Sequence, residues 1–107
     1  MYPPNTTLIL KNPCQHLEFY ALGEITKFVV ESNYGYVTLG NRWIDEFYTK
    51  EVVIKRNARS ISLNNSMDRV EIQESIGWVN FKGNVAEHID VKKASGSFNF
   101  FYDSSTQ

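Results

Sequence analysis

Residues 16–39 read HLEFYALGEITKFVVESNYGYVTL, and this stretch decides the fold that we expect from the sequence. Apolar and polar residues alternate along it, as side chains do along a strand with one buried face. Gly23 stands at the first loop position of the segment LGEI (22–25), where a two-residue type II′ hairpin requires glycine. The segment ESNY (31–34) is typical of a second tight turn. The stretch therefore predicts antiparallel strands joined by hairpins.

Pairing outward from these two turns sorts the side chains onto two faces. The first turn places four apolar side chains on one face: Leu17, Phe19, Phe28 and Val30. The second turn sets Val37 opposite Phe28 on that same face. A register slip of one residue would expose all of them, so the agreement of the two turns predicts that this face is the core.

The opposite face combines aromatic and charged side chains. Its members are Tyr20, Lys27, Tyr34, Tyr36 and Trp43, with His16, Glu18 and Glu31 at one end. Tyr and Trp offer a large contact area with few rotatable bonds, and the charged residues resemble the polar rim of an interface. We interpret these eight residues as a binding site for another protein. The alternative is a second core covered by later strands.

Short runs of this kind recur about every ten residues along the chain, separated by Gly, Asn and Ser. We find no internal repeat and no linker. The pattern predicts a mainly β fold: one antiparallel domain over residues 1–107, a meander-type sandwich or partly open barrel of about eight to ten short strands. Residues 1–5 and 103–107 are expected to be loose ends. Trp78 lies in an expected inner strand and is assigned to the core.

Residues 84–94 are the segment in which a helix competes with a strand. Asn84 is a suitable N-cap, Glu87 follows three positions later, and the lysines at 92–93 suit a helix C-terminus. The same segment also alternates as a strand does. We expect at most one short helix, and we place it here. Residues 41–48 leave the same choice open, with the strand preferred.

Composition excludes several functional classes. The chain has 107 residues, 42% of them hydrophobic, and a net charge of −1, which is the composition of a folded domain. Eleven Lys and Arg against twelve Asp and Glu leave no basic footprint for duplex nucleic acid. The single cysteine, Cys14, cannot form an internal disulfide and suits a reducing compartment. The N-terminus lacks a secretory signal, and no apolar run could span a membrane, so we predict a cytoplasmic protein.

No constellation of residues points to catalysis or to a metal. Cys14, His16, His88 and Asp90 lack the paired spacing of zinc ligands, so no metal or cofactor is expected. The sequence has no nucleophile elbow, Walker A loop or dinucleotide glycine pattern. His16 near Glu18 or Glu31 is an acid–base arrangement that chance supplies in many small domains. We therefore predict that the protein is not an enzyme.

Elimination leaves a binding module as the predicted function. We expect a bacterial immunity or inhibitor protein that neutralises a cognate toxin or enzyme domain by masking it, with a basic toxin domain as one form of partner. The alternative is a small nucleic-acid-acting protein, either a ribonuclease-like hydrolase or a single-strand binder. Residues 76–83, IGWVNFKG, resemble the aromatic strand of cold-shock domains over that run alone, and no function is carried across. Monomer and homodimer both stay open, since an edge strand can pair between subunits.

Overall fold

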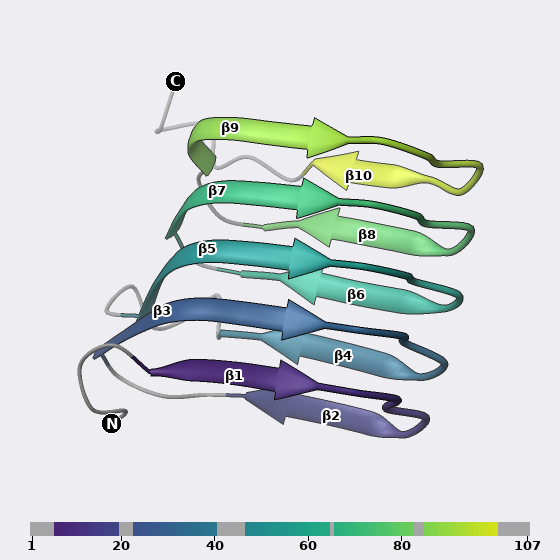
Figure 1. The fold of residues 1–107 in the computed structure, drawn as a ribbon, viewed down its shortest axis with the longest axis horizontal. Coiled ribbons are helices and arrows are strands. Elements are labelled where there is room, and N and C mark those ends of the chain that lie inside the picture. Colours follow the sequence, from purple (N-terminus) through teal and green to yellow (C-terminus); the bar gives the residue numbers. More distant parts are fainter. Residues whose placement is uncertain (1–5, 20–22, 41–46, 65, 83–84, 101–107) are drawn as a thin grey trace.

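A computed structural model of the protein describes residues 6–19, 23–40, 47–64, 66–82 and 85–100. These residues form ten strands and no helix. The strands are β1 (Thr7–Leu10), β2 (His16–Phe19), β3 (Gly23–Val30), β4 (Tyr36–Leu39), β5 (Phe47–Ile54), β6 (Ser60–Leu63), β7 (Ser66–Ile72), β8 (Trp78–Phe81), β9 (Val85–Val91) and β10 (Phe98–Phe100). All pairings are parallel, and the chain winds as a β-solenoid of about four turns (Figure 1).

The solenoid has two sheets of five strands each. The odd sheet has the order β1-β3-β5-β7-β9, and the even sheet has the order β10-β8-β6-β4-β2. Each odd strand and the even strand that follows it form one level, so β1 and β2 are level 1 and β9 and β10 are level 5 (Figure 1). We call the short connection between the two strands of a level the corner. At level 2 the corner is residues 31–35, between β3 and β4.

Parallel pairing stacks equivalent residues into columns, and the inward columns of the described strands are mainly apolar. Phe28, for example, lies between Leu8 and Val52. The buried core consists of Ile25, Phe28, Val30, Val37, Leu39, Val52, Ile54, Ile61, Leu63, Met67, Val70, Ile72, Val79 and Phe81. Across this core, Phe19 of the even sheet meets Phe28 of the odd sheet edge to face, with ring centroids 5.8 Å apart. Each large side chain buried in this way contributes about 1.5–3 kcal/mol, so the core needs no disulfide.

A bend in the odd strands adds one more inward column. The backbone N–H groups of Thr26 and Lys27 both donate to the carbonyl of Thr6, at 3.0 and 3.3 Å, which interrupts the alternation of faces. Ile25 therefore points inward, and Thr49 and Met67 are its stacked neighbours in β5 and β7. The Thr49 hydroxyl is buried in this column without a hydrogen-bond partner among the described residues.

The expected antiparallel sandwich or barrel is wrong. Gly23 is not in a hairpin turn but begins β3, where it pairs with Phe47 of β5. Consecutive strands such as β2 and β3 belong to different sheets, and β2 pairs with β4 instead. Residues 31–34 form part of a corner that carries the chain to the other sheet. Alternation of side chains is the same for parallel and antiparallel strands, so it indicated the buried face but not the partner of each strand.

The expected helix near residues 84–94 is also wrong. The segment Val85–Val91 is strand β9, which pairs in parallel with β7 and sets Ile89 beside Val70. A helix cap contributes about 1 kcal/mol, whereas adding a strand to β7 pairs a whole row of backbone groups and buries Ile89 against the core. Of residues 41–48, positions 41–46 lie outside the described residues, and positions 47 and 48 begin β5.

The structure contains an internal repeat that the sequence analysis missed. Each level repeats the strand–corner–strand arrangement of the level before it, but the number of residues per level varies. One column of the odd sheet holds Thr7, Lys27, Glu51, Arg69 and His88, which are 20, 24, 18 and 19 residues apart in the sequence. An inward column needs apolar side chains, but these side chains do not have to be identical from one level to the next. The irregular period and the variable outer residues therefore hide the repeat.

Buried amides hold the corners in place. Asn33, Asn57 and Ser75 are fully buried and stack as one column of the corner. Asn33 Nδ2 donates to Asn57 Oδ1 at 2.9 Å, and Asn57 Nδ2 donates to Ser75 Oγ at 3.2 Å. Asn57 also donates to the carbonyl of Trp78 at 3.0 Å and accepts the N–H of Arg59 at 3.3 Å. Both the amide N–H₂ and the carbonyl oxygen of Asn57 are therefore satisfied inside the protein.

We predict that Asn57→Ala lowers the free energy of unfolding by about 2–4 kcal/mol, because it leaves several buried corner groups without a partner. Urea denaturation measures the change. The control is Asn99→Ala, which removes one hydrogen bond from an exposed side chain and should cost less than about 0.5 kcal/mol. Equal losses in the two variants would contradict the structural role of the corner column.

We predict that Thr49→Val raises the free energy of unfolding by about 1 kcal/mol. The substitution keeps the shape of the side chain and removes a buried hydroxyl that has no partner among the described residues. Thr38→Val, on the partly exposed face of β4, should change stability by less than about 0.5 kcal/mol. A destabilised Thr49→Val protein would show that the hydroxyl is hydrogen-bonded in solution.

Candidate functional site

The structure divides the predicted binding face between the two sheets. Lys27 lies on the outer face of the odd sheet, and Glu31 follows β3 at the start of a corner. His16, Glu18 and Tyr36 lie on the outer face of the even sheet, with Tyr34 at the adjacent corner. Tyr20 and Trp43 lie outside the described residues. The two outer faces point in opposite directions, because consecutive strands belong to opposite sheets of one solenoid.

The acid–base residues are not assembled into a catalytic site. His16 Nε2 lies 3.2 Å from Glu18 Oε1, and both side chains are exposed at level 1 of the even sheet. His88 lies at level 5 of the odd sheet, and Asp90 follows it on the same strand. Among the described residues, no group of three or more His, Cys, Asp or Glu side chains could hold a metal ion.

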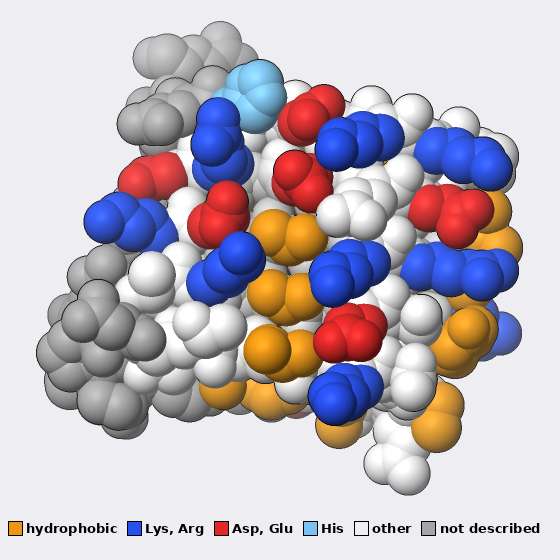
Figure 2. Space-filling model, viewed as in Figure 1, with side chains coloured by type: hydrophobic (Ala, Val, Ile, Leu, Met, Phe, Trp, Pro, Cys, Tyr) orange, Lys and Arg blue, Asp and Glu red, His pale blue; other side chains and the backbone are white. Residues whose placement is uncertain are grey.

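The outer face of the odd sheet is covered mainly by opposite charges. Lys27 Nζ lies 3.5 Å from Glu51 Oε1, and Arg69 follows Glu51 in the same column. Figure 2 shows these columns of basic and acidic side chains beside a short hydrophobic stack over β1, β3 and β5. Exposed ion pairs contribute at most about 1 kcal/mol each, and the mixture of signs favours no charged ligand. This face is a solvated surface.

Among the described residues, the exposed aromatic side chains lie on the even sheet and at the corner next to it. Tyr34 and Tyr36 of level 2 are 47% and 49% exposed, and Ile76 and Trp78 of level 4 are 54% and 60% exposed. At level 3, between them, the equivalent positions hold the small residues Ala58 and Ser60. The result is a depression of about 320 Å³, which we call the notch. The notch is lined by Tyr36, Ala58, Arg59, Ser60, Ile76, Gly77 and Trp78.

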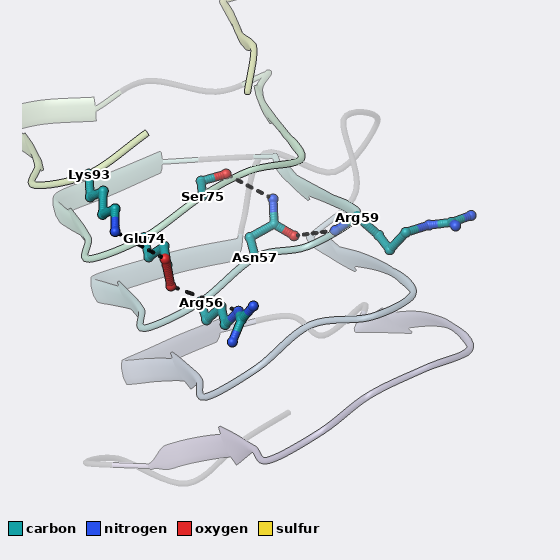
Figure 3. Close-up of polar contacts among 6 residues, drawn as sticks. All are labelled: Arg56, Asn57, Arg59, Glu74, Ser75 and Lys93. Carbon is teal, nitrogen blue, oxygen red and sulfur yellow. Dashed lines mark hydrogen bonds and ion pairs between the residues drawn. The ribbon is translucent and has the colours of Figure 1, made fainter. Parts of the chain in front are cut away.

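Arg59 supplies the charge of the notch from an unusual position. Its column holds glycine at levels 2, 4 and 5, and a Cβ added to Gly77 would collide with the backbone carbonyl of Arg59. Arg59 extends its side chain away from the corner (Figure 3). Its Nη2 donates to the Tyr36 hydroxyl at 3.2 Å, and its guanidinium carbon lies 5.4 Å from the centre of the Tyr36 ring. The cation is thus held against an aromatic wall.

The buried corner column fixes the backbone of the notch. Asn57 accepts the N–H of Arg59 and donates to the carbonyl of Trp78 (Figure 3 shows the bond to Arg59). Asn33 Nδ2 donates to the carbonyl of Ser60 at 3.0 Å. Backbone atoms of three notch residues are therefore bonded to fully buried side chains. Such a site is preorganised, so a ligand does not have to order it.

A row of polar residues runs beside the notch on the even sheet. Asn99 Nδ2 donates to Asn80 Oδ1 at 2.8 Å, and Asn80 Nδ2 donates to Ser62 Oγ at 3.4 Å. These amides bond one another along the levels. Their donors are therefore partly occupied before any ligand arrives.

The assignment of Trp78 to the core is wrong, because the structure leaves most of its side chain exposed. Val79 and Phe81 of the same strand fill the inward columns, so alternation turns Trp78 outward. The sequence contained this signal in WVNF, where two inward apolar residues alternate with Trp78 and Asn80. Arg59 and Ile76 were missed for a different reason: only the stacking of levels brings them into one notch with Tyr36.

Comparison of the chain with protein-family models, with curated protein sequences and with solved structures finds no match. In the part of the chain that the structure describes, no helix is long and apolar enough to cross a membrane.

We predict that Trp78→Ala and Val79→Ala differ sharply in stability although the residues are neighbours. Trp78→Ala should cost less than about 1 kcal/mol, since most of the side chain is already in water. Val79→Ala should cost about 1–3 kcal/mol, because it opens a cavity at a fully buried position. Urea denaturation of both variants tests this, and a larger loss for Trp78→Ala would mean that its ring is buried in solution.

Proposed function

We propose that this protein is a non-enzymatic binding module that recognises another protein through the notch. One observation carries the proposal: three large exposed hydrophobic side chains, Tyr36, Ile76 and Trp78, line the notch together with Arg59. Trp, Tyr and Arg are the residues most enriched at the energetic centres of protein interfaces. The cluster of Tyr36, Arg59 and Trp78 in the notch has the composition of an interface hot spot.

The composition of the notch favours a protein over a sugar. Ile76 is an aliphatic wall residue and Ala58 adds apolar surface, which suits an apolar side chain of a partner. The neighbouring polar row, which a sugar would use for hydrogen bonds, bonds to itself through Asn80 and Asn99. The preorganised backbone at Arg59, Ser60 and Trp78 reduces the entropy lost on binding.

Toxin neutralisation is the specific form of this proposal. An immunity or inhibitor protein acts by masking a cognate toxin or enzyme domain, and the notch offers a rigid surface for that contact. The partner is still a toxin or enzyme domain, but the contact lies at Tyr36, Arg59, Ile76 and Trp78, and the positive charge of Arg59 does not favour a basic contact surface on that partner. The cytoplasmic location stays a prediction.

Site-specific photocrosslinking tests the proposal. A photoreactive amino acid placed at Tyr34, an exposed corner residue stacked next to Ala58 of the notch, should crosslink a partner in cells of the source organism. The same amino acid at Thr7, exposed on the odd sheet, should not crosslink that partner. Mass spectrometry identifies the crosslinked protein, which is then purified for binding measurements. Crosslinking of the same partner from both positions, or of none from Tyr34, would overturn the proposal.

Affinity measurements with the purified partner form the second test. We predict that Trp78→Ala raises Kd by about 30-fold or more, the effect of losing a hot-spot residue. The matched control is Ile9→Ala, which truncates a 53% exposed hydrophobic side chain on the odd sheet and should change Kd less than about twofold. If the partner is a toxin or another enzyme, wild type should inhibit it stoichiometrically and Trp78→Ala should not. Equal effects of the two variants would place the interface elsewhere.

A further inference from the structure

The side chain of Arg59 has unused binding capacity at the edge of the notch. A guanidinium carries five N–H donors, and the structure assigns one contact from Nη2, to the Tyr36 hydroxyl. Among the described residues, the four ion pairs involve other side chains: His16–Glu18, Lys27–Glu51, Arg56–Glu74 and Lys93–Glu74. Arg59 therefore faces solvent as a cation without a carboxylate partner in the described structure.

The neighbouring carboxylate, Glu74, forms ion pairs with two other side chains on another side of the corner. Glu74 lies between Arg56 and Lys93, at 3.8 Å from each, and Figure 3 shows this group separate from the Arg59 guanidinium. The other lining residues of the notch are uncharged. The local charge at the notch is therefore positive, although the whole chain has a net charge of −1.

The Tyr36 side chain restrains the orientation of the Arg59 guanidinium, which favours binding of a planar anion. The ring contact and the hydroxyl bond restrict the Arg59 side chain before a ligand binds. Arginine recognises carboxylates through two parallel N–H···O bonds, and a restrained guanidinium loses less entropy on forming them. A single Arg in the notch is too little positive charge to hold a nucleic-acid backbone, which needs several phosphate contacts.

The space beside Arg59 suits an apolar side chain. Tyr36 and Trp78 lie two strands apart in the even sheet, about 9–10 Å between backbones, with Ser60 between them. Ile76 and Ala58 complete an apolar lining. A ligand that fills this gap and also complements the charge of Arg59 carries an apolar group next to an anion.

We infer that the notch selects a protein segment in which a carboxylate side chain pairs with Arg59 while an adjacent apolar side chain enters between Tyr36 and Trp78. This inference rests on the proposed function, since it names the chemistry of the partner at the same site. It requires no covalent step. The occupant is an acidic–apolar segment of another protein.

Three matched peptides test the selectivity of the notch. Each is an acetylated and amidated pentapeptide of leucines with a central Asp, Asn or Lys, so that only the central side chain differs. Binding to the full chain is followed by NMR titration, with the indole N–H signal of Trp78 and the Nε–H signal of Arg59 as reporters. We expect the Asp peptide to bind about tenfold or more tightly than the Asn peptide, and the Lys peptide to bind least.

Variants assign that preference to Arg59. Arg59→Gln should reduce the preference for Asp over Asn to less than about twofold while both peptides still bind, because the apolar gap is intact. Arg59→Lys keeps the charge but not the paired donors, and should retain only part of the preference. Arg69→Gln removes an exposed cation from the odd sheet and should leave the preference unchanged. Urea denaturation confirms that each variant is folded.

The outcomes separate this inference from the proposed function. Equal binding of the Asp and Asn peptides, abolished by Trp78→Ala, would overturn the role of Arg59 and leave the notch as a protein-binding site. Peptide-induced shifts confined to residues outside the notch would overturn both. Tighter binding of a single-stranded oligonucleotide, falling steeply with salt, would overturn both in favour of nucleic acid. Failure of all three peptides to bind would overturn the inference, and the crosslinking test would then decide the proposed function alone.

Discussion

The buried column of Asn33, Asn57 and Ser75 is the interaction on which both the fold and the notch depend. A chain that crosses from one sheet to the other must bury part of its corner backbone, and buried carbonyl and N–H groups without partners are costly. The two asparagines supply those partners from inside the corner, and each also bonds to the next member of the column. The same amides hold the backbones of Arg59, Ser60 and Trp78. The element that lets the solenoid turn therefore also sets the geometry of the candidate site.

Because the levels stack, inward residues stabilise the fold, whereas outward residues determine the chemistry of the surface. Inward columns are mainly apolar, because each level covers the one below it, and Thr49 is a buried polar exception. Outward columns carry no such requirement, so they are free to differ between levels. The notch arises from this freedom: level 3 has Ala58 and Ser60 where levels 2 and 4 have larger side chains. Arg59 occupies a column that is otherwise mostly glycine and adds the charge.

The two outer faces of the solenoid have different chemistry although the strands that form them alternate along the chain. The odd sheet presents opposite charges that neutralise one another in columns (Figure 2). Beyond the His16–Glu18 pair at level 1, the even sheet presents hydroxyls, amides and exposed aromatic rings. Charged columns keep an exposed sheet face hydrated, whereas the exposed aromatic side chains beside Arg59 are suited to binding. This asymmetry assigns the candidate site to one side of the molecule.

Alternation along the chain was sufficient to identify the inward positions of particular strands, because every strand with one buried face alternates. Phe28, Val30 and Val37 were assigned to the core on that basis and are buried there, and Phe19 packs against them. The same rule applied to Trp78 would have turned it outward. Alternation carries no information about which strand lies alongside. Hairpins were therefore inferred at places where the chain passes to the other sheet. Tyr36, Arg59 and Trp78 come from three levels, and nothing local in the sequence links them. The sequence by itself determined the inward side chains of regularly alternating stretches, such as Phe28, Val30 and Val37, because alternation is a local property of a strand. The tertiary structure decided the inward turn of Ile25 and the meeting of outer residues in the notch, because both depend on backbone pairing between levels.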